Sequence, residues 1–329
     1  MENIFNEFKD DILKQEKEWV LITHRNCVDG IGVYLACYAF AKKHNINLPS
    51  VITCEYSDKE IQEYKQDLNS DPYDLKDANV LIGDFSFPKE VLTALSYKVN
   101  NIVVFDHHKT AKDDLDGLEF CKFDMSKSGA MLVWEFLNGD KEIPSLIKYI
   151  EDRDIWKWEL FRSKEVSAYL TLLSKKIGKK PEEDLKPWIN LLEDENMMQE
   201  TIFIGRHILM YQNQIIESKT KSATYQQPVT IDGVLVPCVN STHLISEIGN
   251  KLAESSPYSA QYFFTETDIV FSLRSIGTVY DVSEICKRFG GGGHVNAAGF
   301  SIPLSVFDCN KFFRTKSLSS EDYKHLIKK

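Results

Sequence analysis

The chain has 329 residues, enough for about two domains at roughly 150 residues each. Hydrophobic residues make up 43% and charged residues 27%, a balance that excludes a mainly disordered chain. The net charge of −10 argues against a protein that coats long nucleic acid, although bound metal ions can reverse the charge at one site.

The sequence shows no sign of a membrane or secreted protein. No run approaches the roughly 18 consecutive apolar residues of a membrane span, and the acidic first segment lacks the basic and apolar regions of a secretory signal. The seven cysteines are scattered and form no CxxC pair, which disfavours a zinc ribbon or a disulfide framework. We therefore expect a cytoplasmic protein with reduced cysteines and no membrane partner.

The first half alternates short apolar runs with helical patterns, which is typical of βαβ units. The runs at 19–23, 51–56, 79–83 and 101–105 are expected to be strands, and helices are expected at 31–43, from Pro88, and repeatedly from Ser128 onward. The predicted fold class is α/β, with a mostly parallel amino-terminal sheet flanked by helices.

The second half begins with polar helices between 186 and 220 and then returns to β-type segments. Strands are expected within 228–240, 261–266 and 268–275, followed by a helix at 282–289. We predict a first domain at 1–195, a helical linker at 196–222, and a smaller α/β domain with a mixed sheet at 223–329.

Three of the predicted strands end in side chains that bind metals. The first ends at His24, with Asp29 five residues later; the third ends at Asp84; the fourth ends at Asp106-His107-His108. Ligands of open α/β sheets lie beyond the carboxyl ends of the strands, so these groups are expected at one edge. Carboxylates with imidazoles suit manganese or magnesium.

Each residue also has a plainer interpretation. Asp84 alone would be as well explained by the capping of the next helix, and His24 alone by a hydrogen bond at a strand end. Cys27 is either a metal ligand or a small buried hydrophobic residue. The coincidence of three such strand ends favours a metal centre.

The motifs resemble those of a known family. HRNCVDG, GDFS, DHH and EDRD are similar to the four metal-site motifs of the DHH phosphoesterase superfamily, and FGGGGHVNAAGF resembles the signature of its DHH-associated second domain. The resemblance covers nearly the whole chain in the expected order. RecJ-like exonucleases, nanoRNases, pAp phosphatases and cyclic-dinucleotide phosphodiesterases are members; family II pyrophosphatases carry a different second domain.

The resemblance implies two divalent cations, with manganese the first choice and magnesium, cobalt, iron and zinc as alternatives. Asp84 would bridge them. The other implied ligands are His24 for one cation, and Asp29, His107 and Asp152 for the other. Asp154 is the rival of Asp152, because side chains two residues apart on a helix point about 200° apart and only one of them can reach the metals.

The resemblance also assigns the remaining residues of the DHH motif. His108 would contact the scissile phosphate, and Asp106 would orient the two histidines. Cys27 stands where many members have an aspartate, and the form HxxCxDG is similar to a recognised sub-branch. A thiolate ligand there would shift the metal preference toward iron, cobalt or zinc.

The glycine motif is expected to bind the rest of the substrate. Gly291, Gly292 and Gly293 would offer backbone N–H groups that a phosphate can approach closely, and His294 and Arg274 would add charge-assisted hydrogen bonds. The alternative is a flexible hinge or a helix C-cap.

We therefore expect a hydrolase that cleaves phosphodiester or phosphomonoester bonds of short oligonucleotides, linear dinucleotides or pAp by two-metal activation of water. A cyclic-dinucleotide phosphodiesterase with the same machinery and a non-catalytic nucleotide sensor are the alternatives. Long duplex nucleic acid is not expected as a partner, and a homodimer is left open.

Overall fold

The computed structural model describes residues 2–55, 58–139, 142–173, 176–178, 180–221 and 228–326. The chain divides into two compact units, Met1–Leu209 and Met210–Lys329. Both combine helices and sheets, so the predicted α/β class is confirmed. Within the described ranges, none of the helices combines the length and the apolar character needed to cross a bilayer.

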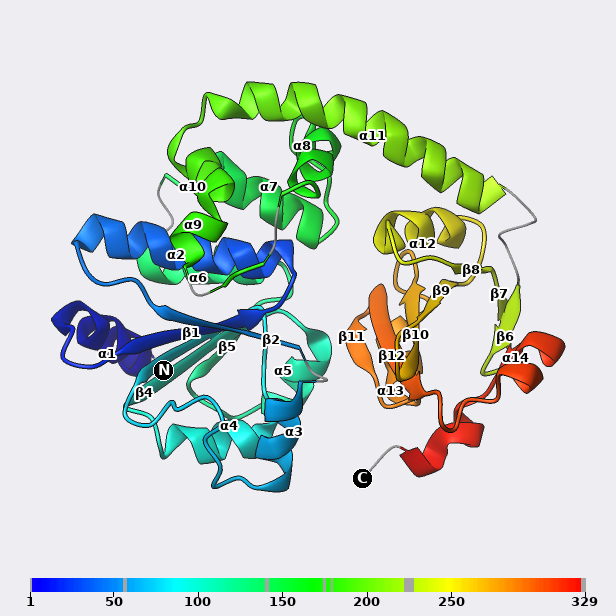
Figure 1. The fold of residues 1–329 in the computed structure, drawn as a ribbon, viewed down its shortest axis with the longest axis horizontal. Helices are drawn as coiled ribbons and strands as arrows, with labels where there is room; N and C mark the ends of the chain where they lie inside the picture. Colours follow the sequence, from blue (N-terminus) through cyan, green and yellow to red (C-terminus); the bar gives the residue numbers. More distant parts are fainter. Residues whose placement is uncertain are drawn as a thin grey trace. The chain divides into compact units, whose positions relative to one another are not determined.

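The first unit is built on a five-stranded parallel sheet in the order β2-β1-β3-β4-β5 (Figure 1). Its strands are β1 (Trp19–His24), β2 (Ser50–Cys54), β3 (Asn79–Gly83), β4 (Asn101–Asp106) and β5 (Cys121–Phe123). Apolar runs buried on both faces are what a parallel sheet requires, and the strands expected from those runs form. Tyr56, expected at the end of the second strand, lies outside the described residues.

Helices cover both faces of this sheet. They are α1 (Glu2–Lys14), α2 (Val28–His44), α3 (Lys59–Gln66), α4 (Lys89–Ser96), α5 (Lys109–Leu115), α6 (Gly129–Asn138), α7 (Ser145–Asp154), α8 (Ser163–Leu170), α9 (Pro181–Asp184) and α10 (Lys186–Glu193). Successive strand residues alternate between the faces: Leu21 packs with α1, α2 and α6, whereas Val20 and Ile22 pack with α3 and α4. Pro88 caps α4 instead of opening its first turn.

The long helix α11 (Met197–Lys221) belongs to both units, because the division between Leu209 and Met210 falls inside it. This division lies within the segment 196–222 that the sequence indicated as a helical linker. Residue 222, the last of that segment, is outside the described residues.

The second unit contains two sheets. A mixed sheet has the order β11-β12-β10-β9-β8 and a smaller one the order β13-β6-β7 (Figure 1). The strands are β6 (Val229–Ile231), β7 (Val234–Val236), β8 (Cys238–Asn240), β9 (Ser259–Phe264), β10 (Asp268–Arg274), β11 (Gly292–His294), β12 (Ala297–Pro303) and β13 (Ser317–Leu318). The helices are α12 (Ile245–Ala253), α13 (Val282–Lys287), α14 (Cys309–Thr315) and the 3-10 helix η1 (Ser320–Leu326).

The core of this unit is rich in aromatic side chains. Phe271 of β10 stacks on Phe300 of β12 with ring centroids 5.1 Å apart, and Phe300 stacks on Phe289 at 4.3 Å. Ile269 and Leu273 join Phe271 on the same face of β10, as the two-residue period of a strand requires. This packing holds the strand that carries Arg274 against the strand beside the glycine motif.

Candidate metal centre

The registers of the parallel sheet bring the predicted strand-end residues to one edge. Thr23 of β1 pairs with Gly83 of β3, and Gly83 pairs with Phe105 of β4. The residues that follow these three, His24, Asp84 and Asp106, therefore lie at the same level of adjacent strands. Neighbouring strands are about 4.8 Å apart, which is close enough for their end residues to share ions.

Three overlapping groups of donor atoms form at this edge of the first unit, and one of them joins Asp84 to Asp106, His107 and His108. The side chains of His24, Cys27 and Asp84 offer ligand atoms within 4.8 Å of one another, and so do those of Asp29, His107 and Asp154. Asp84 connects these last two groups, because its Oδ1 lies 3.4 Å from Nε2 of His107. The same Nε2 atom is 3.3 Å from Asp154 Oδ2 and 3.7 Å from Asp29 Oδ2.

Asp29 is held in place by two backbone amides. It lies in the first turn of α2 and is fully buried. Its Oδ2 accepts a hydrogen bond from Gly129 N at 2.7 Å and its Oδ1 one from Ala130 N at 3.0 Å, at the start of α6. A Cβ at position 129 would lie 2.8 Å from Asp84 Cβ and 2.9 Å from Asp29 Oδ2, so only glycine allows α6 to begin this close to both carboxylates.

Asp84 adopts an unusual backbone conformation immediately after β3. Its φ is +55°, a left-handed conformation that aspartate tolerates better than most residues, and its N–H donates to Phe105 O at 3.0 Å. The side chain is only 3% exposed, and its Oδ2 has no hydrogen-bond partner among the described residues. A buried carboxylate oxygen without a partner is costly, and a cation would satisfy it.

Three aspartates, Asp29, Asp84 and Asp154, surround His107 in this cluster. Burial, followed by the charges of Asp84 and Asp154, raises the pKa of Asp29 well above its usual value. Burial alone would lower the pKa of His107, but the carboxylates of Asp84, Asp154 and Asp29 outweigh it and raise that pKa to about 10.

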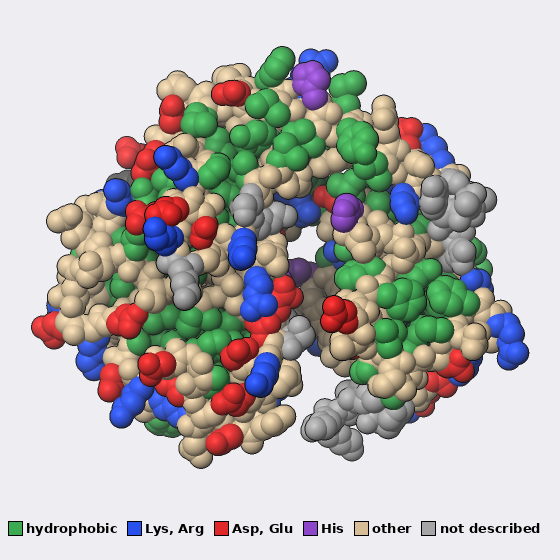
Figure 2. Space-filling model, in the orientation of Figure 1, with side chains coloured by type: hydrophobic (Ala, Val, Ile, Leu, Met, Phe, Trp, Pro, Cys, Tyr) green, Lys and Arg blue, Asp and Glu red, His purple; other side chains and the backbone are tan. Residues whose placement is uncertain are grey.

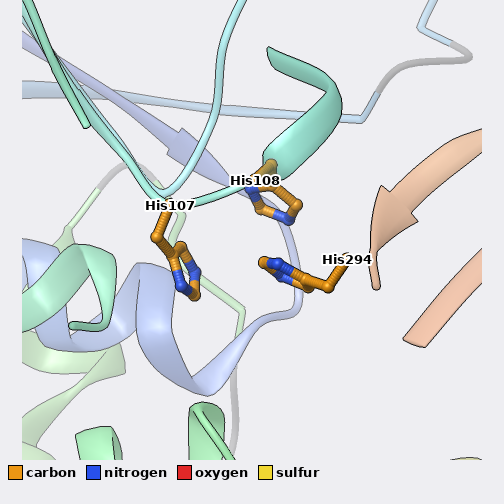
Figure 3. A group of neighbouring side chains, drawn as sticks. All are labelled: His107, His108 and His294. Atoms are coloured by element: carbon orange, nitrogen blue, oxygen red, sulfur yellow. The ribbon is translucent and has the colours of Figure 1, made fainter. Parts of the chain in front are cut away.

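His108 is oriented by Asp106. The two histidines leave the loop between β4 and α5 with their rings 5.1 Å apart and inclined by 64° (Figure 3); His294, drawn in the same picture, belongs to the second unit. Asp106 is fully buried, and its Oδ1 lies 2.6 Å from Nδ1 of His108 while its Oδ2 accepts a hydrogen bond from Ser86 Oγ at 2.5 Å. Ser86, the last residue of GDFS, was not identified from the sequence.

The structure places Asp152 and Asp154 in different surroundings. Asp152 does not join any of these donor groups; its Oδ1 accepts a hydrogen bond from Glu159 N at 2.8 Å and its Oδ2 one from Leu160 N at 3.4 Å. Asp154, at the end of α7, lies beside His107 instead. The two carboxylates do point apart, and the one that lies beside His107 is that of Asp154.

Cys27 caps the start of α2 and lies beside His24 and Asp84. Burial, followed by the charges of the neighbouring aspartates, raises the pKa of its thiol well above the usual value. Imidazole, thiol and carboxylate together form a donor set for a divalent transition metal, softer than the carboxylate-rich group around His107. The residues present thus fit two cations with Asp84 between them.

In the second unit, Arg274 and His294 lie at the same end of the mixed sheet. Both pair with Ala297, Arg274 from β10 and His294 from β11, so one strand separates them. Arg274 donates to Ser246 Oγ at 3.1 Å and to Leu273 O at 2.8 Å. The two predicted substrate-binding side chains are therefore brought to one edge of this unit.

The glycines of the motif make backbone hydrogen bonds that end α13 and pair with β12. Gly290 N and Gly291 N donate to the carbonyls of Lys287 and Cys286 at the end of α13, which is the helix C-cap that was the alternative. Gly292 and Gly293 pair with β12. A Cβ on Gly291 would lie 2.1 Å from Gly299 O. The N–H of Gly291, which the sequence analysis expected to face a phosphate, donates to the backbone in this structure.

Two curated proteins are similar to the chain over most of its length. The uncharacterized protein R106 of Acanthamoeba polyphaga mimivirus is 30% identical over 311 residues, covering 91% of this chain and 71% of that protein. The oligoribonuclease NrnB of Bacillus subtilis is 25% identical over 316 residues, covering 86% and 73%. No family model matches the chain.

The fold is also that of a solved structure. RecJ of Thermus thermophilus, in complex with Mn²⁺, superposes with a TM-score of 0.54 at 13% identity, covering 96% of this chain and 55% of RecJ. With the motifs in their order and their side chains gathered at one sheet edge, these similarities show that the chain belongs to the DHH phosphoesterase superfamily.

Proposed function

We propose that the protein is a metal-dependent hydrolase of phosphate esters that acts on short nucleotides. The observation that supports this best is the buried, unpartnered Oδ2 of Asp84 between two groups of metal-binding side chains. The similarity to an oligoribonuclease over 86% of the chain supports the substrate class.

Two divalent cations fit the donor groups. His24, Cys27 and Asp84 would hold one, and Asp84, Asp29, His107 and Asp154 the other. When bound, such a pair lowers the pKa of the attacking water and neutralises the phosphoryl oxygens. Manganese is the first choice, since RecJ of the same fold has been solved with Mn²⁺.

His108 is the residue that we propose to act on the phosphate. Its burial opposes the charged form, but Asp106 outweighs burial and raises the pKa of His108. Because Nδ1 is engaged by Asp106, the protonated ring presents its Nε2–H away from that carboxylate. That hydrogen can bond a phosphoryl oxygen and then pass to the leaving oxygen of the ester.

A short substrate agrees with the surface and with the second unit. On the face of the first unit drawn in Figure 2, Asp and Glu side chains are interspersed with Lys and Arg, which does not favour a long nucleic acid track. Arg274 and His294, at one end of the second sheet, would bind a terminal phosphate of the nucleotide.

The test is hydrolysis of RNAs of two to five residues, of pAp and of cyclic dinucleotides, each with and without Mn²⁺. We expect Mn²⁺-dependent release of mononucleotides from the linear RNAs, abolished in Asp84→Ala and His107→Ala and retained in Asp116→Ala, which removes an exposed carboxylate after α5. Selective cleavage of cyclic dinucleotides would show that these, and not short linear nucleotides, are the substrates. Tight nucleotide binding with Mn²⁺ bound and no cleavage of any substrate would overturn the hydrolase.

A further inference from the structure

The five tryptophans of the chain fall into two classes. Trp19, Trp134 and Trp188 are at most 6% exposed and lie in the core of the first unit. Trp156 and Trp158, which follow the last metal motif, are half-buried and belong to none of the hydrophobic clusters that the described residues form. Core packing therefore does not explain them.

The backbone of both residues is strained. Trp156 has a φ of +61° and Trp158 a φ of +58°, which is a genuine outlier for a bulky side chain. Such conformations persist only where the surrounding structure holds them, and they gather at functional sites. A loop that is strained at two large aromatic residues requires an explanation beyond chain reversal.

Asp152 is what holds this loop. Its carbonyl accepts hydrogen bonds from Lys157 N at 2.9 Å and Trp158 N at 3.3 Å, and its carboxylate those from Glu159 N and Leu160 N. One residue thus receives four backbone N–H groups from the loop. The position of the two rings is consequently set by the same helix end that carries Asp154.

Cations lie over both rings. The guanidinium carbon of Arg153 is 4.9 Å from the ring centroid of Trp156 and 5.9 Å from that of Trp158, and Lys164 Nζ is 5.7 Å from Trp158. The rings themselves are 5.0 Å apart and meet edge to face at 76°. Aromatic faces bordered by positive charge favour a ligand that is both aromatic and anionic, and disfavour a purely apolar one.

We propose that Trp156 and Trp158 form a platform on which a nucleobase of the substrate stacks, with Asp152 as its positioning residue. The platform is close to the metal centre, because consecutive Cα atoms are about 3.8 Å apart and Trp156 is two residues from Asp154. A nucleotide whose phosphate lies at the metal centre can therefore reach the rings with its base. This inference rests on the proposed function and adds base recognition to it.

The experiment compares pApA with the same molecule lacking its bases, by equilibrium binding with Mn²⁺ and by steady-state hydrolysis. In the wild type, loss of the bases should weaken binding and raise KM by about 5-fold to 150-fold, the range of one stacked base. In Trp156→Ala and Trp158→Ala, the ratio of KM for the base-free molecule to KM for pApA should fall toward one, and kcat should be less affected. Trp156→Phe should keep most of the wild-type ratio, and Tyr97→Ala, at a side chain 85% exposed in the same unit, should keep all of it.

The comparison of two ligands within each variant separates stacking from misfolding, because a damaged fold weakens both ligands alike. Hydrolysis of pApA with no penalty for losing the bases would overturn the platform and leave the phosphoesterase standing. Base-dependent binding without hydrolysis in the wild type would do the reverse. A penalty unchanged in all tryptophan variants would place base recognition elsewhere and overturn the proposal.

Discussion

Asp154 Oδ2 lies 3.3 Å from Nε2 of His107, at the point where α7 ends beside the carboxyl edge of the sheet. Asp152, two residues earlier in the same helix, turns its carboxylate to the loop that follows. Two aspartates of one motif thus have separate tasks.

Alanine at these two positions should have opposite effects. Asp154→Ala should lower the affinity for Mn²⁺ by more than about tenfold, the smallest loss typical of even indirect partners of a metal. It should not reduce the stability of the metal-free protein, because burial raises the pKa of this carboxyl and its charged form is already disfavoured. Titration calorimetry with Mn²⁺ and thermal unfolding of the apo protein measure both quantities.

Asp152→Ala should instead cost about 1–3 kcal/mol of folding free energy, because two backbone N–H groups lose a charged acceptor. Its affinity for Mn²⁺ should stay within about threefold of the wild-type value, the usual range of context effects away from ligands. Loss of Mn²⁺ binding in this variant, with binding retained in Asp154→Ala, would restore the assignment first made from the sequence.

A second prediction concerns the partner of His108. Asp106→Asn keeps the shape but replaces a carboxylate that holds Nδ1 at 2.6 Å. Since partners of this kind are typically worth about 10-fold to 100-fold, kcat should fall by that factor. Ser86→Ala, which removes only the hydrogen bond to the other oxygen, is the control and should lower kcat less. Equal losses in the two variants would indicate that Asp106 acts through packing alone.

Cys27 gives a prediction that does not depend on turnover. With Co²⁺ in place of Mn²⁺, the wild type should show a sulfur-to-cobalt charge-transfer band in the near ultraviolet, because a cation favours the thiolate despite the raised pKa of the free thiol. Cys27→Ser should lose the band, and Cys309→Ser, at a half-buried cysteine of the second unit, should keep it. A wild-type spectrum without the band would make Cys27 a half-buried capping residue only.

A side chain larger than hydrogen in the glycine motif should disturb the packing of the second unit. Gly291→Ala should destabilise the second unit by about 1–3 kcal/mol, the usual cost of overpacking, because its Cβ would lie 2.1 Å from Gly299 O. Gly299→Ala is the matched control, since its Cβ would meet nothing closer than 3.0 Å. Chemical denaturation followed by the fluorescence of the whole chain compares the two. Equal stability of the variants would contradict the tight contact of this segment with β12.

Much of the first unit follows from its sequence because its strands are buried on both faces. β1, β3 and β4 are continuous apolar runs, and their last residues were recognised as a metal-binding edge. The strand β5 was not predicted from the sequence, because Cys121–Phe123 has only three residues and none of them is buried. An edge strand of this kind leaves no hydrophobic pattern to detect.

The site itself shows where local patterns are insufficient. The spacing of Asp152 and Asp154 tells that they diverge on a helix, but it does not tell which side faces His107; the loop hydrogen bonds that decide this involve Glu159 and Leu160. The conformations of Trp156 and Trp158 were equally hidden, since a positive φ at tryptophan contradicts local preference and the loop that contains them is held by hydrogen bonds to Asp152. In the glycine motif, chain packing and ligand binding demand the same residue type.

The donor atoms come from segments that begin at residue 24 and end at residue 154. A nascent chain synthesised from its amino terminus accordingly exposes several acidic ligands long before α7 supplies the last one. Complete chelation requires α7 to be in place, and bound ions would then stabilise the folded first unit and raise its melting temperature as their concentration rises.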